Sequence, residues 1–256
     1  PTGREIAVWD LGRRQVSASW ATTARFVAFD AINGVRVLHE IGDHAVESRT
    51  FLQGVPTPFG GVMLMDRTFV PSAAASSGPW VAVGGEDGRV TLTEPRYKCI
   101  VDTFRSKLAS IRAAAFASHT ELALVDGAGQ VEIVELKEQK TKGKQGPACN
   151  GSVQATTKAR FKLASPFSPQ GASGARVDGL DGKLLFTTAS GEVFASTTTG
   201  PARSLGKLAE GATLTRGASD SGGNVTTRQG TTAFAPTHDK RDALSLIRIS
   251  EPTRPY

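Results

Sequence analysis

Short hairpin units recur along this 256-residue chain and constrain its fold more than any other feature. Each unit is a run of apolar residues, a turn that contains glycine, and a second run in which apolar residues alternate with others. This pattern is typical of a β-hairpin. The clearest copies are residues 80–92, 121–136 and 183–196, and weaker copies surround Gly34 and Gly230. The repetition predicts an all-β chain.

Glycines mark the turns of these units. In the copy at 80–92, Asp87 and Gly88 supply the positive φ that a tight turn needs. The turn glycines of all copies are Gly3, Gly34, Gly88, Gly129, Gly191 and Gly230. Their successive spacings are 31, 54, 41, 62 and 39 residues. Two of these lie near the roughly 40–45 residues of a four-stranded propeller blade, and we interpret the spacings of 54 and 62 as blades with inserted loops.

The start of the chain carries the most specific motif. Residues 3–11 read GREIAVWDL and resemble the third strand of a WD40 blade, which ends in a Trp-Asp pair, here Trp9 and Asp10. Residues 110–116 resemble the inner strand of such a blade, and residues 42–44 are a distorted form of the family's Gly-His dipeptide. Later copies lack the Trp-Asp pair, so the repeats are degenerate. The resemblance to the WD40 family covers most of residues 1–243 and implies a β-propeller.

The copies amount to about five blades and a half blade at the start. Stacked blades bury both faces of each sheet, which a single blade cannot do alone. We therefore expect an incomplete WD40-like β-propeller from a seven-bladed parent. Another β-propeller family is the alternative, whereas a β-sandwich would not produce the returns at about 40 residues.

Polar segments interrupt the repeats. Residues 71–79 (PSAAASSGP) and the stretch from 137 to about 172 are rich in Gly, Pro, Ser and Lys, which favours exposed loops. Residues 244–256 read LSLIRISEPTRPY and closely resemble LSLIHISEPTR, the translation of a transposase sequencing adapter. We therefore expect a partial propeller over 1–243, with one long loop insert at 137–172, and a non-native tail over 244–256.

The chain is moderately basic, with 30 Lys and Arg against 24 Asp and Glu. Such a balance permits acidic partners without requiring them. One dense basic stretch consists of Lys137, Lys140, Lys142 and Lys144. Its Gln and Gly content predicts a solvated loop, and contact with RNA or another acidic partner is the alternative. No aromatic residue lies between the lysines to stack on bases.

The sequence contains no motif that predicts catalysis. A nucleophile elbow, a phosphate-binding loop, an HExxH motif and a CxxC pair are all missing. The four histidines, at 39, 44, 119 and 238, do not have the spacing of a metal site. We therefore predict no catalytic, metal-binding or cofactor-binding residue, and no enzymatic activity.

The cysteines and tryptophans support structural interpretations. Two cysteines are too few for a disulfide framework, and we expect Cys99 to be a buried free thiol in a strand and Cys149 to lie in a loop. Trp9 and Trp80 are expected to pack between blades, and Trp20 to lie at a blade edge. Because two cysteines do not argue for an oxidising compartment, we expect an intracellular protein, cytoplasmic or nuclear. With no membrane span, we expect no contact with membranes.

Three function hypotheses remain. The WD40 resemblance implies a non-catalytic scaffold that presents its faces to partner proteins within an assembly. The basic loop suggests a propeller in a ribonucleoprotein or ribosome-assembly particle that contacts RNA. A propeller enzyme would instead need acidic or histidine side chains at its central channel. We favour the scaffold.

Overall fold

The computed structural model describes residues 4–10, 15–32, 35–52, 55–64, 66–78, 80–138, 153–168, 175–180, 182–208, 213–216, 223–227, 230–235 and 245–246. Within these ranges the elements are β-strands and one 3-10 helix, η1 (Pro95–Tyr97). No helix among these residues has the length and apolarity needed to cross a membrane.

The described strands form one two-stranded and five four-stranded antiparallel sheets, which we call blades 1 to 6 in chain order. Blade 1 contains β1 (Arg4–Asp10) and β2 (Gln15–Thr22). Blade 2 contains β3 (Phe26–Ile32), β4 (Val35–Ile41), β5 (Ala45–Leu52) and β6 (Val55–Met63). Blade 3 contains β7 (Pro71–Ser77), β8 (Trp80–Gly85), β9 (Arg89–Glu94) and β10 (Cys99–Arg105).

The remaining blades repeat the same order of four strands. Blade 4 contains β11 (Ala113–Ser118), β12 (Glu121–Val125), β13 (Gln130–Glu138) and β14 (Val153–Lys162). Blade 5 contains β15 (Arg176–Leu180), β16 (Lys183–Thr187), β17 (Glu192–Thr197) and β18 (Arg203–Lys207). Blade 6 contains β19 (Thr213–Arg216), β20 (Gly223–Thr227), β21 (Gly230–Ala235) and β22 (Ser245–Leu246).

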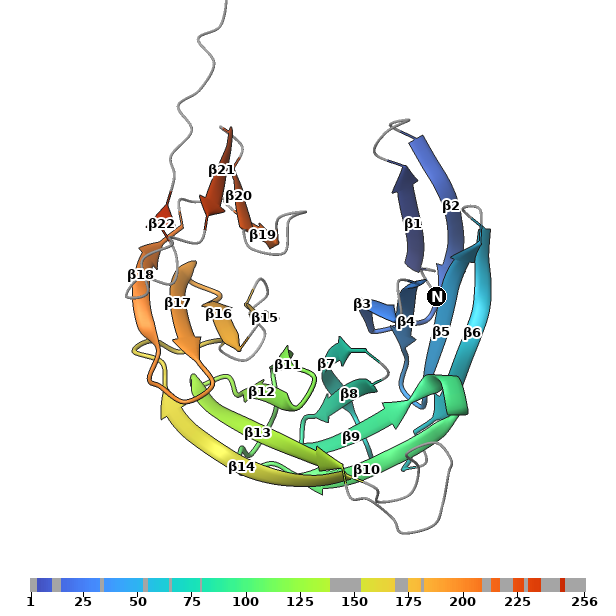
Figure 1. Cartoon of the computed structure of the whole chain (residues 1–256), viewed down its shortest axis with the longest axis horizontal. Helices are drawn as coiled ribbons and strands as arrows, with labels where there is room; N and C mark the ends of the chain where they lie inside the picture. Colours follow the sequence, from blue (N-terminus) through green and yellow to red (C-terminus); the bar gives the residue numbers. More distant parts are fainter. Residues whose placement is uncertain are drawn as a thin grey trace, which may run out of the picture.

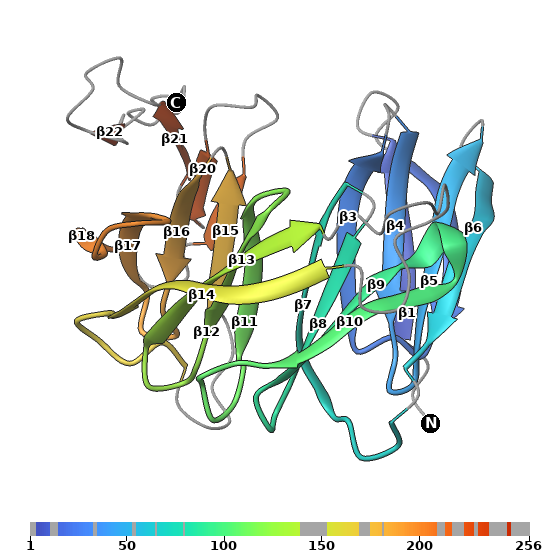
Figure 2. The same cartoon turned by 60° about the horizontal axis from the view of Figure 1, so that its bottom comes forward.

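The blades stand side by side around a common centre in an open arc (Figure 1). The first strands of successive blades lie nearest the centre, where β7 contacts β3 on one side and β11 on the other, and β11 also contacts β15. The fourth strands β10 and β14 run along the outer surface (Figure 2). This radial arrangement confirms the predicted incomplete β-propeller with five four-stranded blades and one half blade.

Glycine turns close blades 3, 4 and 5 at one end. Between the second and third strands of blades 3, 4 and 5, Gly88, Gly129 and Gly191 have φ angles of 79°, 86° and 83°, as the turn chemistry predicts. The residue after the fourth strand donates its backbone N–H to the carbonyl of that glycine: Ser106 to Gly88, Leu163 to Gly129 and Leu208 to Gly191, at 2.8–2.9 Å. Each of these turns therefore also anchors the chain that leaves its blade.

One turn was assigned to the wrong place in the repeat. Gly34 lies between the first and second strands of blade 2, β3 and β4, whereas the turn equivalent to Gly88 lies between β4 and β5, at residues 42–44. Both connections are short and contain glycine, so sequence alone did not separate them. The 54-residue spacing from Gly34 to Gly88 therefore compares unlike turns and does not indicate an insert.

Two segments that we expected to be loops contain strands. Residues 71–77 form β7, an inner strand in which Ala73 and Ala75 are buried. Small residues are needed where inner strands meet: a Cβ on Gly179 of β15 would lie 2.0 Å from the carbonyl oxygen of Phe116. The ten-residue strand β14 lies within the expected insert 137–172. Many residues of β14 are polar and exposed because the strand lies on the outer surface. Its composition is therefore similar to that of a loop.

The core lies between the blades. One buried cluster joins blades 3 and 4, a second joins blades 4 and 5, and a third joins blades 2 and 3. Trp80 belongs to the first cluster and is 5% exposed, which confirms the predicted packing between blades. Burial of an apolar side chain of this kind contributes about 1.5–3 kcal/mol. Packing between neighbouring sheets therefore supplies much of the stability of the propeller.

Cys99 differs from its prediction. It begins β10 as a half-buried residue, and it is disulfide-bonded rather than a free thiol. The only other cysteine of the chain, Cys149, is outside the described residues. Because disulfides persist mainly in oxidising compartments, the expected intracellular location gains no support from Cys99 and stays a prediction.

Candidate functional site

The predicted basic loop is described only at its first residue. Lys137 is exposed near the end of β13, and its Nζ lies 3.0 Å from Oε2 of Glu135. Lys140, Lys142 and Lys144 are outside the described residues. Within the described part, the positive charge of this loop is therefore paired with a carboxylate, and RNA contact stays a prediction.

The other residues singled out from the sequence occupy separate parts of the propeller. Trp9 and Asp10 lie at the end of β1, and their side chains are outside the description. Asp87 accepts a hydrogen bond from the backbone N–H of Arg89, 3.1 Å away, and so supports its turn. His39, His44 and His119 lie in β4 and in two different turns, and no three His, Cys, Asp or Glu side chains gather as metal ligands among the described residues.

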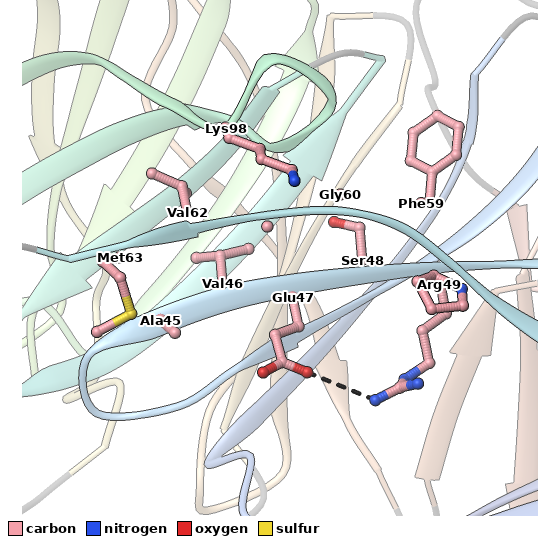
Figure 3. A pocket seen from close by; sticks show the side chains of 12 residues that line it. Ala45, Val46, Glu47, Ser48, Arg49, Phe59, Gly60, Val62, Met63 and Lys98 are labelled. Atoms are coloured by element: carbon pink, nitrogen blue, oxygen red, sulfur yellow. Dashed lines mark hydrogen bonds and ion pairs between the residues drawn. The ribbon is translucent and has the colours of Figure 1, made fainter.

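A groove on the outer surface of the propeller is the candidate site, and we call it the rim groove (Figure 3). It encloses about 510 Å³ between the outer strands β5 and β6 of blade 2 and the turn that follows η1 in blade 3. Its lining residues are Ala45, Val46, Glu47, Ser48, Arg49, Pro58, Phe59, Gly60, Gly61, Val62, Met63 and Lys98.

Two glycines form the floor of the rim groove. Gly60 and Gly61 of β6 pair with Ser48 and Glu47 of β5. A Cβ on Gly60 would lie 2.2 Å from the carbonyl oxygen of Pro95, so only glycine lets the backbone of η1 approach β6 this closely. At Gly60 the rim groove is therefore closed by the backbone of η1, which packs directly against β6.

Apolar side chains line the rim groove from both faces of β6. Met63, at the end of β6, is 61% exposed and lies on the side of Ala45, whereas the half-buried Val62 lies on the opposite side and the half-buried Phe59 lies farther along the strand (Figure 3). Methionine and aromatic residues are enriched at the centres of protein interfaces, where flexible thioethers fit varied partners. An exposed methionine at the edge of a groove therefore suits contact with another chain.

Lys98 lies over the rim groove from the neighbouring blade (Figure 3). It has φ 53° and ψ 45°, and it is the one non-glycine residue with positive φ in the described part of the chain. A lysine in this left-handed conformation is strained relative to glycine. No described carboxylate lies within ion-pair distance of its ammonium group. The backbone therefore holds an exposed, unpaired positive charge at the groove.

The other charged groups of the rim groove are paired. Arg49 Nε lies 2.5 Å from Oε1 of the buried Glu40, and its Nη2 lies 3.4 Å from Oε2 of Glu47, as the dashed line in Figure 3 marks. Burial of Glu40 would raise its pKa, but hydrogen bonds from Thr22, Arg49 and Trp20 outweigh it, so the pKa of Glu40 is lowered. Glu40 is therefore ionised at neutral pH and balances Arg49.

A buried histidine lies behind the groove floor. Ser48 Oγ and His39 Nδ1 are 2.7 Å apart and share a hydrogen bond, and Nε2 of His39 is buried without a partner in the described structure. Burial lowers the pKa of His39 from 6.5 to about 4. The imidazole is therefore neutral at pH 7 and adds no charge to the rim groove.

A second cleft of about 510 Å³ lies between blades 3 and 4. Ser77 Oγ and His119 Nδ1 are 2.8 Å apart there and join the end of β7 to the turn after β11. Glu135 and Lys137, which also line this cleft, pair with each other. Its polar groups thus bind one another across two blades, which is a structural arrangement.

Sequence reasoning missed the rim groove. Its residues come from two strands of one blade and a turn of the next, so no local motif joins them. The Gly60-Gly61 pair inside an outer strand was the one available signal, because glycine in a strand marks a close backbone approach.

Comparisons with known proteins identify similar folds. No family model and no curated protein matches the chain. A functionally unknown protein from Desulfotomaculum acetoxidans is similar in structure, with a TM-score of 0.64, 8% identity, and coverage of 96% of this chain and 76% of the other. The β-propeller domain of Myceliophteria thermophila Cps50 (Swd1) is similar with a TM-score of 0.54 and 10% identity, and the match covers 91% of this chain and 91% of the other. KlHsv2 with loop 6CD replaced by a Gly-Ser linker is similar with a TM-score of 0.56 and 12% identity, and the match covers 94% of this chain and 77% of the other. At such identities the similarity concerns the fold alone: this chain has a β-propeller fold.

Proposed function

We propose that this protein is a non-catalytic scaffold that binds a partner protein through the rim groove within a macromolecular assembly. The observation that carries the proposal is a groove on the outer surface whose lining includes an exposed methionine, Met63, and a lysine, Lys98, without an ion pair among the described residues. Interfaces combine a central apolar anchor with polar groups around it. The rim groove offers both.

Partner capture by groove variants tests this proposal. Met63→Glu places a charge on the apolar wall, and because Met63 is 61% exposed the change leaves the core intact. Val70→Glu is the matched control, since Val70 is also exposed, at 40%, but does not line the groove. We expect the wild type and Val70→Glu to retain the same partner from cell extract and Met63→Glu to lose it.

The result has a clear alternative. If all three proteins are folded by circular dichroism and retain the same partners in equal amounts, the rim groove is not the binding surface. A partner that dissociates only from Val70→Glu would place the interface at the connection between β6 and β7.

A further inference from the structure

The outer edge of blade 4 is open to a further strand. The sheet ends at β14, which pairs with β13 and with no other strand in the described part of the chain. This ten-residue strand lies on the outer surface of the propeller (Figure 2). Backbone N–H and C=O groups on the outer edge of a sheet can pair with an extended segment of another chain.

Positive charge distinguishes β14 from the outer strands of blades 1 and 2. The strand contains Lys158, Arg160 and Lys162 and no acidic residue, whereas β2 and β6 contain no charged residue. Lys158 forms an ion pair with Glu121. Arg160 and Lys162 are exposed and have no ion pair within the described ranges. Two neighbouring positive charges are therefore left on an open strand.

The carboxylate opposite Arg160 is already engaged elsewhere. Glu132 of β13 pairs with Arg160 in the register of the two strands and is 1% exposed. Its oxygens accept hydrogen bonds from Oγ of Ser106, the backbone N–H of Lys107 and Oγ1 of Thr157, at 2.5–2.7 Å. Glu132 therefore belongs to the contact between blades 3 and 4 rather than to an ion pair with Arg160.

The two faces of β14 differ in chemistry. Side chains alternate along a strand, so Arg160 and Lys162 share one face and Ala159 and Phe161 share the other. Ala159 and Phe161 are half-buried against the core between blades 4 and 5, where the rings of Phe161 and Phe186 lie edge to face at 6.1 Å. A strand added beside β14 would place alternate side chains next to each face. Acidic residues suit the first face and apolar residues suit the second.

We propose that the outer edge of β14 binds an extended segment of a partner protein in which acidic and apolar residues alternate, added to blade 4 as a fifth strand. Carboxylates of the segment pair with Arg160 and Lys162, which are about 7 Å apart along the strand. Its apolar side chains lie beside Phe161. Single-stranded nucleic acid fits less well, because Phe161 is the one aromatic residue of β14 and its ring already packs on Phe186. This edge is on blade 4, so the inference does not depend on the rim groove.

Peptide binding to the purified full chain tests the inference. The probes are fluorescent peptides of equal length in which Leu alternates with Glu, Leu with Gln, or Ser with Glu, and fluorescence anisotropy is measured at low and high salt. We expect the Leu-Glu peptide to bind best and the Leu-Gln peptide about fivefold more weakly, because two cross-strand charge pairs are lost. This difference should shrink at high salt. The Ser-Glu peptide should also bind more weakly, since it buries no apolar side chain beside Phe161.

Variants of β14 identify the edge that binds. Lys162 lies opposite the uncharged Gln130, so Lys162→Gln should leave the fold intact and weaken binding of the Leu-Glu peptide about twofold. The double variant Arg160→Gln/Lys162→Gln should weaken it about fivefold and bind the Leu-Gln peptide as the wild type does. Lys183→Gln is the control, because Lys183 is exposed but lies in β16, which has a strand on each side. It should leave the affinity unchanged.

Two further probes separate strand addition from simple charge attraction. A Leu-Glu peptide with methylated backbone nitrogens cannot donate hydrogen bonds to β14 and should not bind. Labelled oligouridine should bind more weakly than the Leu-Glu peptide.

Several results would overturn the inference. Equal affinities of the Leu-Glu and Leu-Gln peptides, or of the double variant and the wild type, would exclude carboxylates on Arg160 and Lys162. A methylated peptide that binds as well as the unmethylated one would exclude a fifth strand. Oligouridine that binds through Arg160 and Lys162 while the Leu-Glu peptide does not would assign the edge to nucleic acid. If no probe binds and the double variant aggregates faster than the wild type, the two cations only protect an open edge.

Discussion

The indole N–H of Trp20 in β2 donates a hydrogen bond to Oε1 of Glu40 in β4, 3.0 Å away, and so joins blade 1 to blade 2. Thr22 Oγ1 and Arg49 Nε donate to the same carboxylate at 2.5 Å each, and the Arg49 guanidinium lies 5.7 Å from the centre of the Trp20 ring. Glu40 is 6% exposed. The half blade is therefore held by a buried, fully satisfied carboxylate.

Glu40→Ala should destabilise the protein by about 3 kcal/mol, because it leaves the half-buried donors of Trp20 and Arg49 without the buried carboxylate that accepts from them. Glu47→Ala, which removes the exposed partner of Arg49, should cost less than about 1 kcal/mol. Guanidinium unfolding of both variants measures the difference. Equal free energies of unfolding would mean that Glu40 does not join the two blades.

Acid should destabilise the protein through His39. Its folded pKa of about 4 is below the unfolded value of 6.5, so the unfolded chain binds the proton first as the pH falls. The full stability is present above about pH 6.5, and about 3 kcal/mol is lost as the pH falls to about 4. Unfolding free energies across this range should show the slope in wild type and in His44→Gln, an exposed control, but not in His39→Phe.

Lys98→Gly should raise the free energy of unfolding by about 1 kcal/mol, because glycine adopts the left-handed conformation without the Cβ penalty. Lys98→Ala loses the same charge but keeps the Cβ, and it should give no such gain. Thermal unfolding distinguishes the two. If alanine stabilises as much as glycine, charge rather than backbone strain is responsible.

Gly60→Ala should destabilise by about 1–3 kcal/mol, because its Cβ would lie 2.2 Å from the Pro95 carbonyl oxygen and force β6 and η1 apart. Gly42→Ala is the control, since its Cβ would have only an ordinary contact at 3.8 Å. Denaturant unfolding of both variants should give a clearly larger loss for Gly60→Ala. If Gly60→Ala leaves the free energy of unfolding unchanged, η1 does not pack against β6 at Gly60.

The repeat pattern was sufficient to predict the architecture. Gly88, Gly129 and Gly191 occupy equivalent turns because a positive φ is a local requirement that sequence shows directly. Trp80 was placed correctly for a similar reason, since a large apolar residue in a strand must be buried. These features depend on neighbours in sequence or on one residue's own chemistry.

Position relative to the axis was harder to predict. The inner strand β7 consists of small residues because strands converge there, and the outer strand β14 is polar because it faces solvent, so both resembled loops. The rim groove was missed because its lining comes from β5 and β6 of blade 2 and from Lys98 of blade 3, which come together only when the two blades are packed. Such features follow from tertiary packing and carry no periodic signal.

The most direct test of the proposed binding surface is the methyl NMR signal of Met63. The chain has two methionines, so labelling their methyl groups gives two signals, and Met63→Leu assigns the relevant one. On addition of the captured partner, we predict that the Met63 signal shifts with saturation. A Met63 signal that stays unchanged while the partner is bound would contradict the assignment of the rim groove as the partner site.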